Sequence, residues 1–127
     1  MSLKRILYAD DEPLVQAIAR VSLVKMGGFE LRICSSGAEL LEQVKPFAPQ
    51  LILLDVVMPG MDGPATLQCL QQDPATAAIP VVFLTANAEP HDVAHYKSLG
   101  AVGVIAKPYN PANLGEQVRQ IWATLDA

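Results

Sequence analysis

The 127-residue sequence lacks the marks of several large protein classes. No apolar run approaches the roughly 20 residues that a membrane-spanning helix needs, and the apolar stretch behind the basic pair Lys4-Arg5 is far too short for a signal peptide. The sequence also has no basic run or stripe, and its formal net charge is -4. We therefore expect this segment to bind neither nucleic acid nor a membrane.

Cysteine is scarce too. Cys34 and Cys69 fit no metal-binding spacing and make no disulfide framework, so we expect reduced thiols in a cytoplasmic protein. Internal repeats and low-complexity tracts are missing as well. What the sequence does have is a hydrophobic fraction of 51% with 17% charged residues, which is typical of one globular domain at this length.

Short apolar runs alternate with segments of helical periodicity along the chain. We expect strands at residues 5–9, 30–34, 51–55, 81–85 and 103–106, each followed by a helix. This alternation predicts an α/β domain over residues 4–125, in which helices cover both faces of a parallel sheet. Residues 1–3 are left outside the expected domain.

The first and last expected helices each carry an apolar stripe. The stripe of the first consists of Leu14, Ala17, Ile18, Val21 and Val24. The stripe of the last consists of Leu114, Val118, Ile121 and Leu125. Trp122 lies beside this second stripe, and we expect it to pack against the core instead of binding a ligand.

Polar and ionisable residues gather where the expected strands end. Asp10 and Asp11 follow the first strand, and Asp55 ends the third. Thr85 ends the fourth strand, and Lys107 follows the fifth. The carboxyl ends of parallel strands share one edge, where open α/β sheets bind their ligands. We therefore expect three carboxylates, a hydroxyl and an ammonium in one cleft.

Each of these residues also has an ordinary explanation. Asp10 and Asp11 are good helix caps, and Asp55 opens a stretch rich in turn residues. Thr85 suits a strand, and Lys107 suits a solvated loop. Taken singly these explanations hold, but they do not explain why the ionisable groups share one end of the sheet.

A chemical explanation accounts for the whole set. Clustered carboxylates repel one another and resist ionisation, and Mg²⁺ relieves that repulsion with two or so carboxylates, a backbone carbonyl and waters. An aspartate at such a site can attack phosphorus and form an aspartyl-phosphate. Phosphoryl transfer then needs in-line positioning and neutralised phosphoryl oxygens. The pattern indicates a Mg²⁺-dependent phosphoryl-transfer site.

Four motifs, YADDE, LLDVVMPGMDG, FLTA and AKPY, occur in an order that resembles the response-regulator receiver domains of two-component signalling. The resemblance implies a doubly wound, flavodoxin-like (βα)5 fold with strand order 2-1-3-4-5. It implies a sensor histidine kinase or a histidine phosphotransfer protein as phosphodonor, and a conformational change that regulates an output. The domain is then no enzyme beyond assisting its own phosphorylation and dephosphorylation.

The resemblance also implies roles for single residues. Asp55 corresponds to the phosphoacceptor. Asp11, Asp55 and the Val57 carbonyl correspond to Mg²⁺ ligands, with Asp10 acting on the metal largely through water. Thr85 and Lys107 correspond to the residues that contact the phosphoryl group.

A cis peptide before Pro108 belongs to the same resemblance. Two positions depart from the family's common pattern. Val104 stands where the family often has a switch Tyr or Phe, so coupling to the far surface is weakened or runs through other groups. Val57 and Asn87 occupy the positions that tune phosphoryl hydrolysis, and Val57 offers no group that orients a water.

Other classes fit parts of the sequence. An aspartate-nucleophile phosphatase requires a second Asp at the position of Val57, which argues against that class. A flavodoxin-like cofactor binder requires hydroxyls and glycines in the first loop, where ADDEP instead carries negative charge. A docking module with an inactive site stays open because of Val104. His91 and His95 have the spacing of a helical metal pair but no third ligand, and we expect them to be surface residues.

Overall fold

The computed structural model describes residues 2–125, and within this range five strands form one parallel sheet. The strands are β1 (Arg5–Ala9), β2 (Glu30–Cys34), β3 (Leu51–Asp55), β4 (Val81–Thr85) and β5 (Gly103–Ala106). They pair in the order β2-β1-β3-β4-β5. The predicted fold class and strand order are confirmed, and each strand has the bounds that its apolar run predicted.

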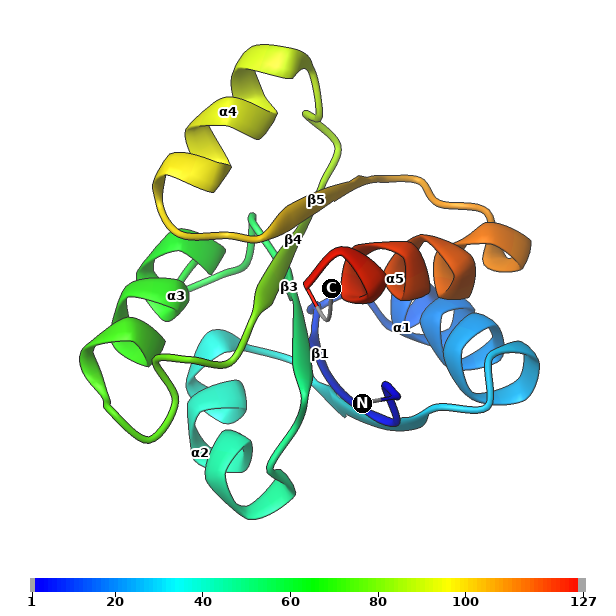
Figure 1. The fold of residues 1–127 in the computed structure, drawn as a ribbon, viewed down its shortest axis with the longest axis horizontal. Coiled ribbons are helices and arrows are strands. Elements are labelled where there is room, and N and C mark those ends of the chain that lie inside the picture. Colours follow the sequence, from blue (N-terminus) through cyan, green and yellow to red (C-terminus); the bar gives the residue numbers. More distant parts are fainter. Residues whose placement is uncertain (1, 126–127) are drawn as a thin grey trace.

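Helices cover both faces of this sheet (Figure 1). They are α1 (Pro13–Arg20), α2 (Gly37–Phe47), α3 (Gly63–Gln72), α4 (Pro90–Ser98) and α5 (Pro111–Leu125). Figure 1 shows α1 and α5 on one side of the strands, with α2, α3 and α4 on the other. None of the helices within residues 2–125 is long and apolar enough to cross a membrane.

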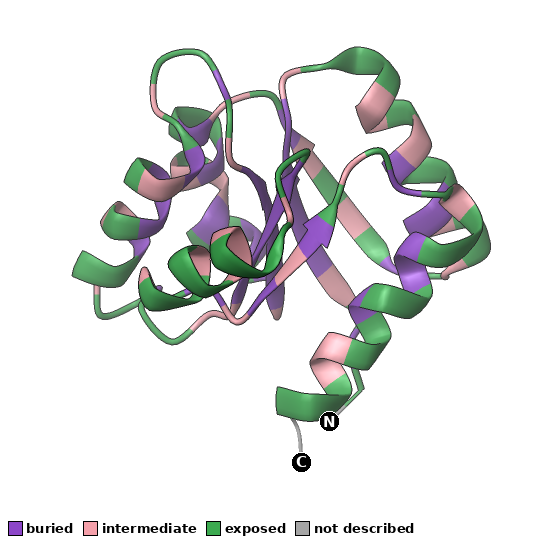
Figure 2. Cartoon of the chain, turned by 90° about the horizontal axis from the view of Figure 1, so that it is seen from above, coloured by how far each residue is buried: buried purple, intermediate pink, exposed green. Residues whose placement is uncertain are grey.

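The core consists of two apolar clusters, one on each face of the sheet. Side chains alternate along a strand, so β3 places Leu51 and Leu53 in the cluster under α1 and α5, and Ile52 and Leu54 in the other. All residues of β3 and β4 are buried, as the purple centre of Figure 2 shows. Burial on both faces explains why these strands read as unbroken apolar runs. Leu3, just outside the expected domain, also packs in the first cluster.

The first helix differs from the prediction. Its α-helical part ends at Arg20, and the chain continues as a π-helical segment, η1 (Val21–Met26). The expected apolar stripe is wrong, because Leu14 and Val21 are 73% and 41% exposed. The buried residues of this region are Ala19, Ser22 and Leu23. Ser22 made that face look polar, but its hydroxyl donates a hydrogen bond to the Pro111 carbonyl and is thereby satisfied.

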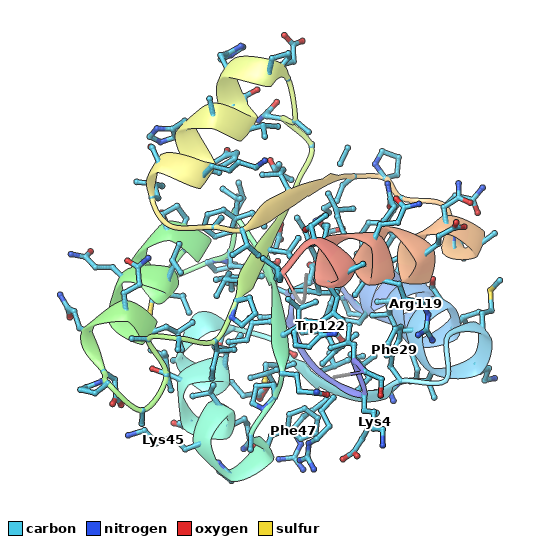
Figure 3. All side chains as sticks on the ribbon, in the orientation of Figure 1. Lys4, Phe29, Lys45, Phe47, Arg119 and Trp122 are labelled. Atoms are coloured by element: carbon cyan, nitrogen blue, oxygen red, sulfur yellow. The ribbon has the colours of Figure 1, made fainter. Side chains whose placement is uncertain are left out.

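Helix α5 packs against η1 through small residues, and one cation–π contact joins it to Phe29, which follows η1 in the chain. A Cβ added to Gly115 would lie 3.6 Å from the Ser22 carbonyl oxygen, which is an ordinary contact distance. The Arg119 guanidinium lies over the Phe29 ring at 4.3 Å, and Figure 3 shows these two side chains together beside η1. With the Ser22–Pro111 hydrogen bond, these contacts fix the turn between β5 and α5.

The turn after β3 is tightly packed as well. Gly63 begins α3, and a Cβ placed there would lie 2.5 Å from the Asp55 carbonyl oxygen and 2.9 Å from the Val56 Cα. The Gly63 N–H donates to the Val56 carbonyl at 2.9 Å. The Asp62 side chain caps α3 by accepting from the Ala65 N–H at 2.9 Å. These contacts hold the backbone of Asp55 in place.

We expect Gly63→Ala to lower the free energy of unfolding by about 1–3 kcal/mol, because the new methyl group meets backbone atoms that cannot move aside. Gly115→Ala is the matched control. It has room for a methyl group, and the higher helix propensity of alanine makes it neutral or stabilising by up to about 1 kcal/mol. Urea unfolding followed by circular dichroism measures both. Equal effects of the two substitutions would contradict the packing described for the β3–α3 turn.

Candidate functional site

The ends of β1, β3 and β5 bring charged groups to one edge of the sheet. Carboxylate oxygens of Asp10, Asp11 and Asp55 all lie within 4.8 Å of one another. The Lys107 ammonium donates to Asp10 Oδ2 at 3.1 Å and to Asp55 Oδ1 at 3.2 Å. The Lys107–Pro108 peptide is cis, as the resemblance implies. Four of the residues that the sequence singled out therefore form one cluster.

Asp10 is a buried carboxylate with several donors. Its side chain is 0% exposed, and its Oδ1 accepts from the Glu12 N–H at 3.0 Å. The side-chain amide of Gln16 donates to the backbone carbonyl of Asp10. Helix α1 has Glu12 at its N-cap and no side-chain capping bond, so neither Asp10 nor Asp11 caps this helix. The ordinary explanation for the aspartate pair does not hold.

The charges of the cluster act on one another. Burial first, and then the negative charge of Asp10, raise the pKa of Asp55 to about 6, although Lys107 acts in the opposite direction. Burial alone would lower the pKa of Lys107, but its hydrogen bonds and charge attraction to Asp10 and Asp55 raise it. Three carboxylates face one ammonium, so the cluster has an excess of negative charge near neutral pH. Mg²⁺ suits such a set of oxygen ligands.

The other predicted site residues lie around this cluster. Thr85 is buried at the end of β4, and its Oγ1 accepts from the Asn87 N–H at 3.0 Å. The Thr85 backbone carbonyl accepts from the Lys107 N–H at 2.8 Å. Within residues 2–125, the Thr85 hydroxyl makes no hydrogen bond to the side chain of Asp55 or Lys107. Val57 follows β3, and its side chain is 74% exposed. Val104 is a half-buried residue of β5 that packs against the cluster under α2, α3 and α4.

Sequence reasoning missed two tyrosines beside the cluster. The hydroxyl oxygens of Tyr8 and Tyr109 lie 2.6 Å apart, and the Tyr8 hydroxyl lies 3.4 Å from Asp10 Oδ2. Burial is the main cause that raises the pKa of Tyr109 to about 12 and the pKa of Tyr8 far above its usual range. Tyr8 stands two residues before Asp10, and Tyr109 two after Lys107. This spacing of two residues from a predicted site residue was the signal in the sequence that could have placed both tyrosines near the site.

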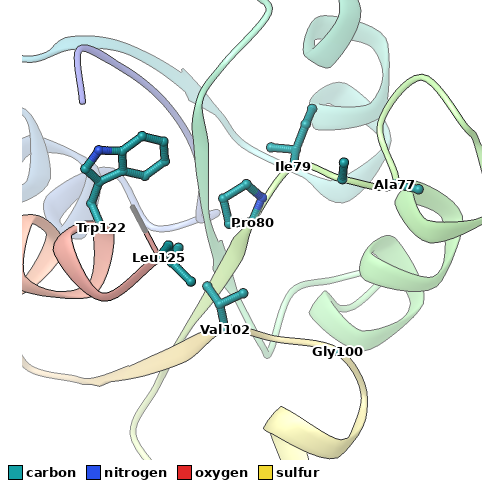
Figure 4. Close-up of a pocket in the computed structure, with 8 residues that line it drawn as sticks. Ala77, Ile79, Pro80, Gly100, Val102, Trp122 and Leu125 are labelled. Atoms are coloured by element: carbon teal, nitrogen blue, oxygen red, sulfur yellow. The ribbon is translucent and has the colours of Figure 1, made fainter. Parts of the chain in front are cut away.

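Two of the hollows in the described part of the chain lie at opposite ends of the strands. One, of about 240 Å³, adjoins the charged cluster and is lined by residues that include Val15, Lys107 and Tyr109. Another, of about 380 Å³, is lined by residues that include Pro80 and Trp122 (Figure 4). Pro80 directly precedes β4, so this second hollow lies at the amino ends of the strands, away from the carboxylates. It offers no ionisable side chain.

The remaining sequence hypotheses concern single side chains. Trp122 is partly buried and packs against the cluster under α1 and α5, as expected. His91 and His95 are both exposed, as expected, and His91 Nε2 lies 3.4 Å from Asp92 Oδ1. In the part of the chain that the structure describes, the three aspartates form the only group of three or more potential metal ligands.

A parallel sheet in this strand order, with buried aspartates and a lysine at its carboxyl edge, defines a flavodoxin-like domain with an acidic site. The family model of the response regulator receiver domain matches residues 6–119, and the chain belongs to this family. Its role is that of a phosphoacceptor domain in two-component signalling. Receiver domains bind Mg²⁺ at an acidic pocket, and the aspartate cluster is of that kind.

Several known proteins are similar to this chain. Protein-glutamate methylesterase/protein-glutamine glutaminase 2 of Rhodopseudomonas palustris is 42% identical over 82% of the chain and 28% of its own length. The DNA-binding response regulator MtrA of Mycolicibacterium smegmatis is 33% identical over 91% of the chain and 49% of its own length. The chain thus spans less than half of these relatives. The crystal structure of a response regulator from Desulfuromonas acetoxidans has a TM-score of 0.83 at 28% identity, covering 96% of this chain and 98% of that one.

The raised pKa of Asp55 predicts a pH-dependent cost to stability. The pKa is 3.8 for an unperturbed carboxyl and about 6 in the fold, so ionised Asp55 is disfavoured by folding. The cost is absent below about pH 4 and fully present above about pH 6. In metal-free buffer at pH 7.5, we expect Asp55→Asn to raise the free energy of unfolding by about 1–2 kcal/mol. The gain should shrink as the pH falls toward 4.

Asp73→Asn is the matched control, because the ion pair with Lys45 lowers the pKa of that carboxyl. It should not stabilise the protein at pH 7.5. Urea unfolding at several pH values measures both variants. A gain for Asp55→Asn that is as large at pH 4 as at pH 7.5 would show that the cost does not come from ionisation of Asp55.

Proposed function

We propose that Asp55 is the phosphoacceptor of this receiver domain and that the reaction depends on Mg²⁺. The observation that carries the proposal is the Lys107 ammonium, which bridges the two buried carboxylates of Asp10 and Asp55 at the carboxyl edge of the sheet. A partly buried ammonium at this point is placed to meet an incoming phosphoryl group. An exposed turn aspartate beside a solvated lysine would have neither the burial nor the pairing.

Asp11, Asp55 and the Val57 carbonyl would hold the metal ion, with Asp10 acting largely through water. The clustered carboxylate oxygens support this assignment. The Val57 carbonyl accepts no backbone hydrogen bond from residues 2–125, which leaves it available as a ligand. When bound, Mg²⁺ neutralises negative charge on the carboxylates and on the phosphoryl oxygens.

The transfer itself forms one bond and breaks one. A carboxylate oxygen of Asp55 attacks phosphorus, and the bond between phosphorus and the donor breaks, with its electron pair leaving on the donor. Lys107 has three N–H donors, so it can bind a phosphoryl oxygen while it stays paired with Asp10. The Thr85 hydroxyl would donate to a second phosphoryl oxygen. With its pKa at about 6, Asp55 is mostly ionised at neutral pH and ready to attack.

The donor would be a sensor histidine kinase or a histidine phosphotransfer protein in the cytoplasm. Family membership and the absence of a membrane-spanning helix within residues 2–125 support this setting. The phosphorylated domain would then regulate an effector domain or protein, since the relatives are longer than this chain and have different output activities in their names. The chain itself would assist only its own phosphorylation and dephosphorylation.

A docking module with an inactive site is the second candidate, and Val104 is the observation that favours it. This half-buried aliphatic residue has neither a ring nor a hydroxyl that could follow events at the site. An inactive site, however, has no need of a buried Asp55 paired with Lys107. Phosphorylation measurements separate the two candidates.

We expect acetyl phosphate and Mg²⁺ to add one labile phosphoryl group to the chain, seen by intact-mass measurement. Asp55→Asn should abolish the adduct, and so should a chelator, because the acceptor oxygen or the metal is then missing. Asp73→Asn, at the far end of α3, should leave it unchanged. An adduct on His91 or His95, or one that survives Asp55→Asn, would refute the assignment.

We also expect the adduct to decay slowly, because hydrolysis needs a water held in line with phosphorus and opposite Asp55. Val57 has no group that holds such a water, and the Asn87 amide cannot act as a base near neutral pH. Val57→Asn should therefore speed decay several-fold in Mg²⁺. Val57→Ala is the control that removes bulk without adding a polar group. If Val57→Asn leaves the decay rate unchanged or slows it, this role of Val57 is wrong.

A further inference from the structure

Two buried hydroxyl groups continue the chain of contacts at the site. The Tyr8 side chain is 0% exposed and Tyr109 is 9% exposed. Their hydroxyl oxygens lie 2.6 Å apart, and the Tyr8 hydroxyl faces Asp10 Oδ2 at 3.4 Å. The same Oδ2 accepts from Lys107, which also donates to Asp55. The contacts therefore run from Tyr109 through Tyr8, Asp10 and Lys107 to the proposed phosphoacceptor.

The direction of these hydrogen bonds follows from counting acceptors. An ionised carboxylate accepts only, so Tyr8 donates to Asp10. Among the described residues, Tyr8 is the hydrogen-bond partner of the Tyr109 hydroxyl. A hydroxyl has one proton, so once Tyr8 donates to Asp10, Tyr109 is the donor in the contact between the two hydroxyls. Buried hydroxyl protons seldom go unpaired, so Tyr109 donates to Tyr8 and Tyr8 donates to Asp10.

We infer that Tyr8, held by Tyr109, is a positioning residue that fixes the Asp10 carboxylate for binding of a divalent cation. The inference rests on the proposed function of this site. Asp10 Oδ1 is held by the Glu12 N–H at 3.0 Å, and Tyr8 holds the other oxygen. Tyr8 lies on β1 and Glu12 directly precedes α1, so these two donors, together with Lys107 on Oδ2, hold both oxygens of the carboxylate from different directions.

The tyrosine contact has a purpose that Lys107 does not serve. Lys107 divides its donors between Asp10 and Asp55, and an incoming phosphoryl group draws on the same ammonium. Tyr8 has no other anionic partner among the described residues, so its hold on Asp10 persists when Lys107 is engaged elsewhere. Donors behind a metal-binding group commonly change metal affinity 10- to 100-fold when they are removed.

The test is the Mg²⁺ dissociation constant, measured by isothermal titration calorimetry on the folded chain. Tyr8→Phe removes the hydroxyl and keeps the ring, and should weaken binding about tenfold, the lower end of that range because the contact with Asp10 is long. Tyr109→Phe leaves Tyr8 in place and should weaken binding only about threefold. Because the hydroxyls act in series, the double variant should match Tyr8→Phe alone.

Two references define the scale of the measurement. Tyr96→Phe is the matched control, since this third tyrosine is on α4 with its ring against Phe83 at 5.3 Å, and its affinity should equal that of the native chain. Asp11→Ala removes a proposed metal ligand and should show how much Mg²⁺ affinity is lost when the site itself is damaged. Thermal unfolding shows that each variant is folded at the titration temperature. Should Tyr8→Phe fail to fold, Tyr109→Phe still carries the test.

The outcomes separate this inference from the proposed function. A native chain that binds no Mg²⁺ and takes no phosphoryl group overturns both. A native chain that binds Mg²⁺ and loses it in Asp11→Ala, with Tyr8→Phe at the native affinity, overturns only the positioning role. Losses that multiply in the double variant overturn the series arrangement, because they show that the two hydroxyls act independently.

Discussion

The site depends on one interaction, the bridge from the Lys107 ammonium to the carboxylates of Asp10 and Asp55. Two carboxylates that are almost fully buried would repel each other and resist ionisation without a cation nearby. The bridge needs the carboxyl ends of β1, β3 and β5 to lie on the same side of the sheet, and the parallel arrangement provides this. The contacts that hold α5 against η1 thus matter to the site, because they fix the turn that carries Lys107.

Most of the fold could be predicted because local signals agreed with one another. Each strand is a short apolar run that ends at a polar residue or a turn, and the charged cluster follows from parallel strand ends alone. The buried face of the first helix could not be predicted, because it includes Ser22, whose burial is made possible by a hydrogen bond to the Pro111 carbonyl, far along the chain. The contact of Tyr8 with Tyr109 likewise joins distant segments, and the spacing of two residues from Asp10 and from Lys107 places each tyrosine near the site without predicting that their hydroxyls meet.

The loop after β3 combines a rigid part with an open one. Gly63 and the Asp62 cap fix the backbone at the start of α3, which keeps the Asp55 backbone in position. Val57, two residues after Asp55, is largely exposed and packs against little. A substitution at Val57 therefore changes the surroundings of Asp55 with little effect on the core. Such an arrangement is expected where a rigid backbone positions the reacting group and an exposed side chain beside it adjusts the reaction rate.

The donors around Asp10 explain how the site keeps its negative charge. A second lysine or an arginine in place of Tyr8 would satisfy Asp10 more strongly, but it would also cancel the excess negative charge that a divalent cation needs. A tyrosine hydroxyl and a backbone N–H are neutral donors, so they orient the carboxylate and leave its charge in place. Burial first, and then this negative charge, raise the pKa of Asp55, which costs stability when no cation is bound. The resting domain is thus held in a less stable charge state that binding of a cation relieves, a conflict between stability and function that is common at functional sites.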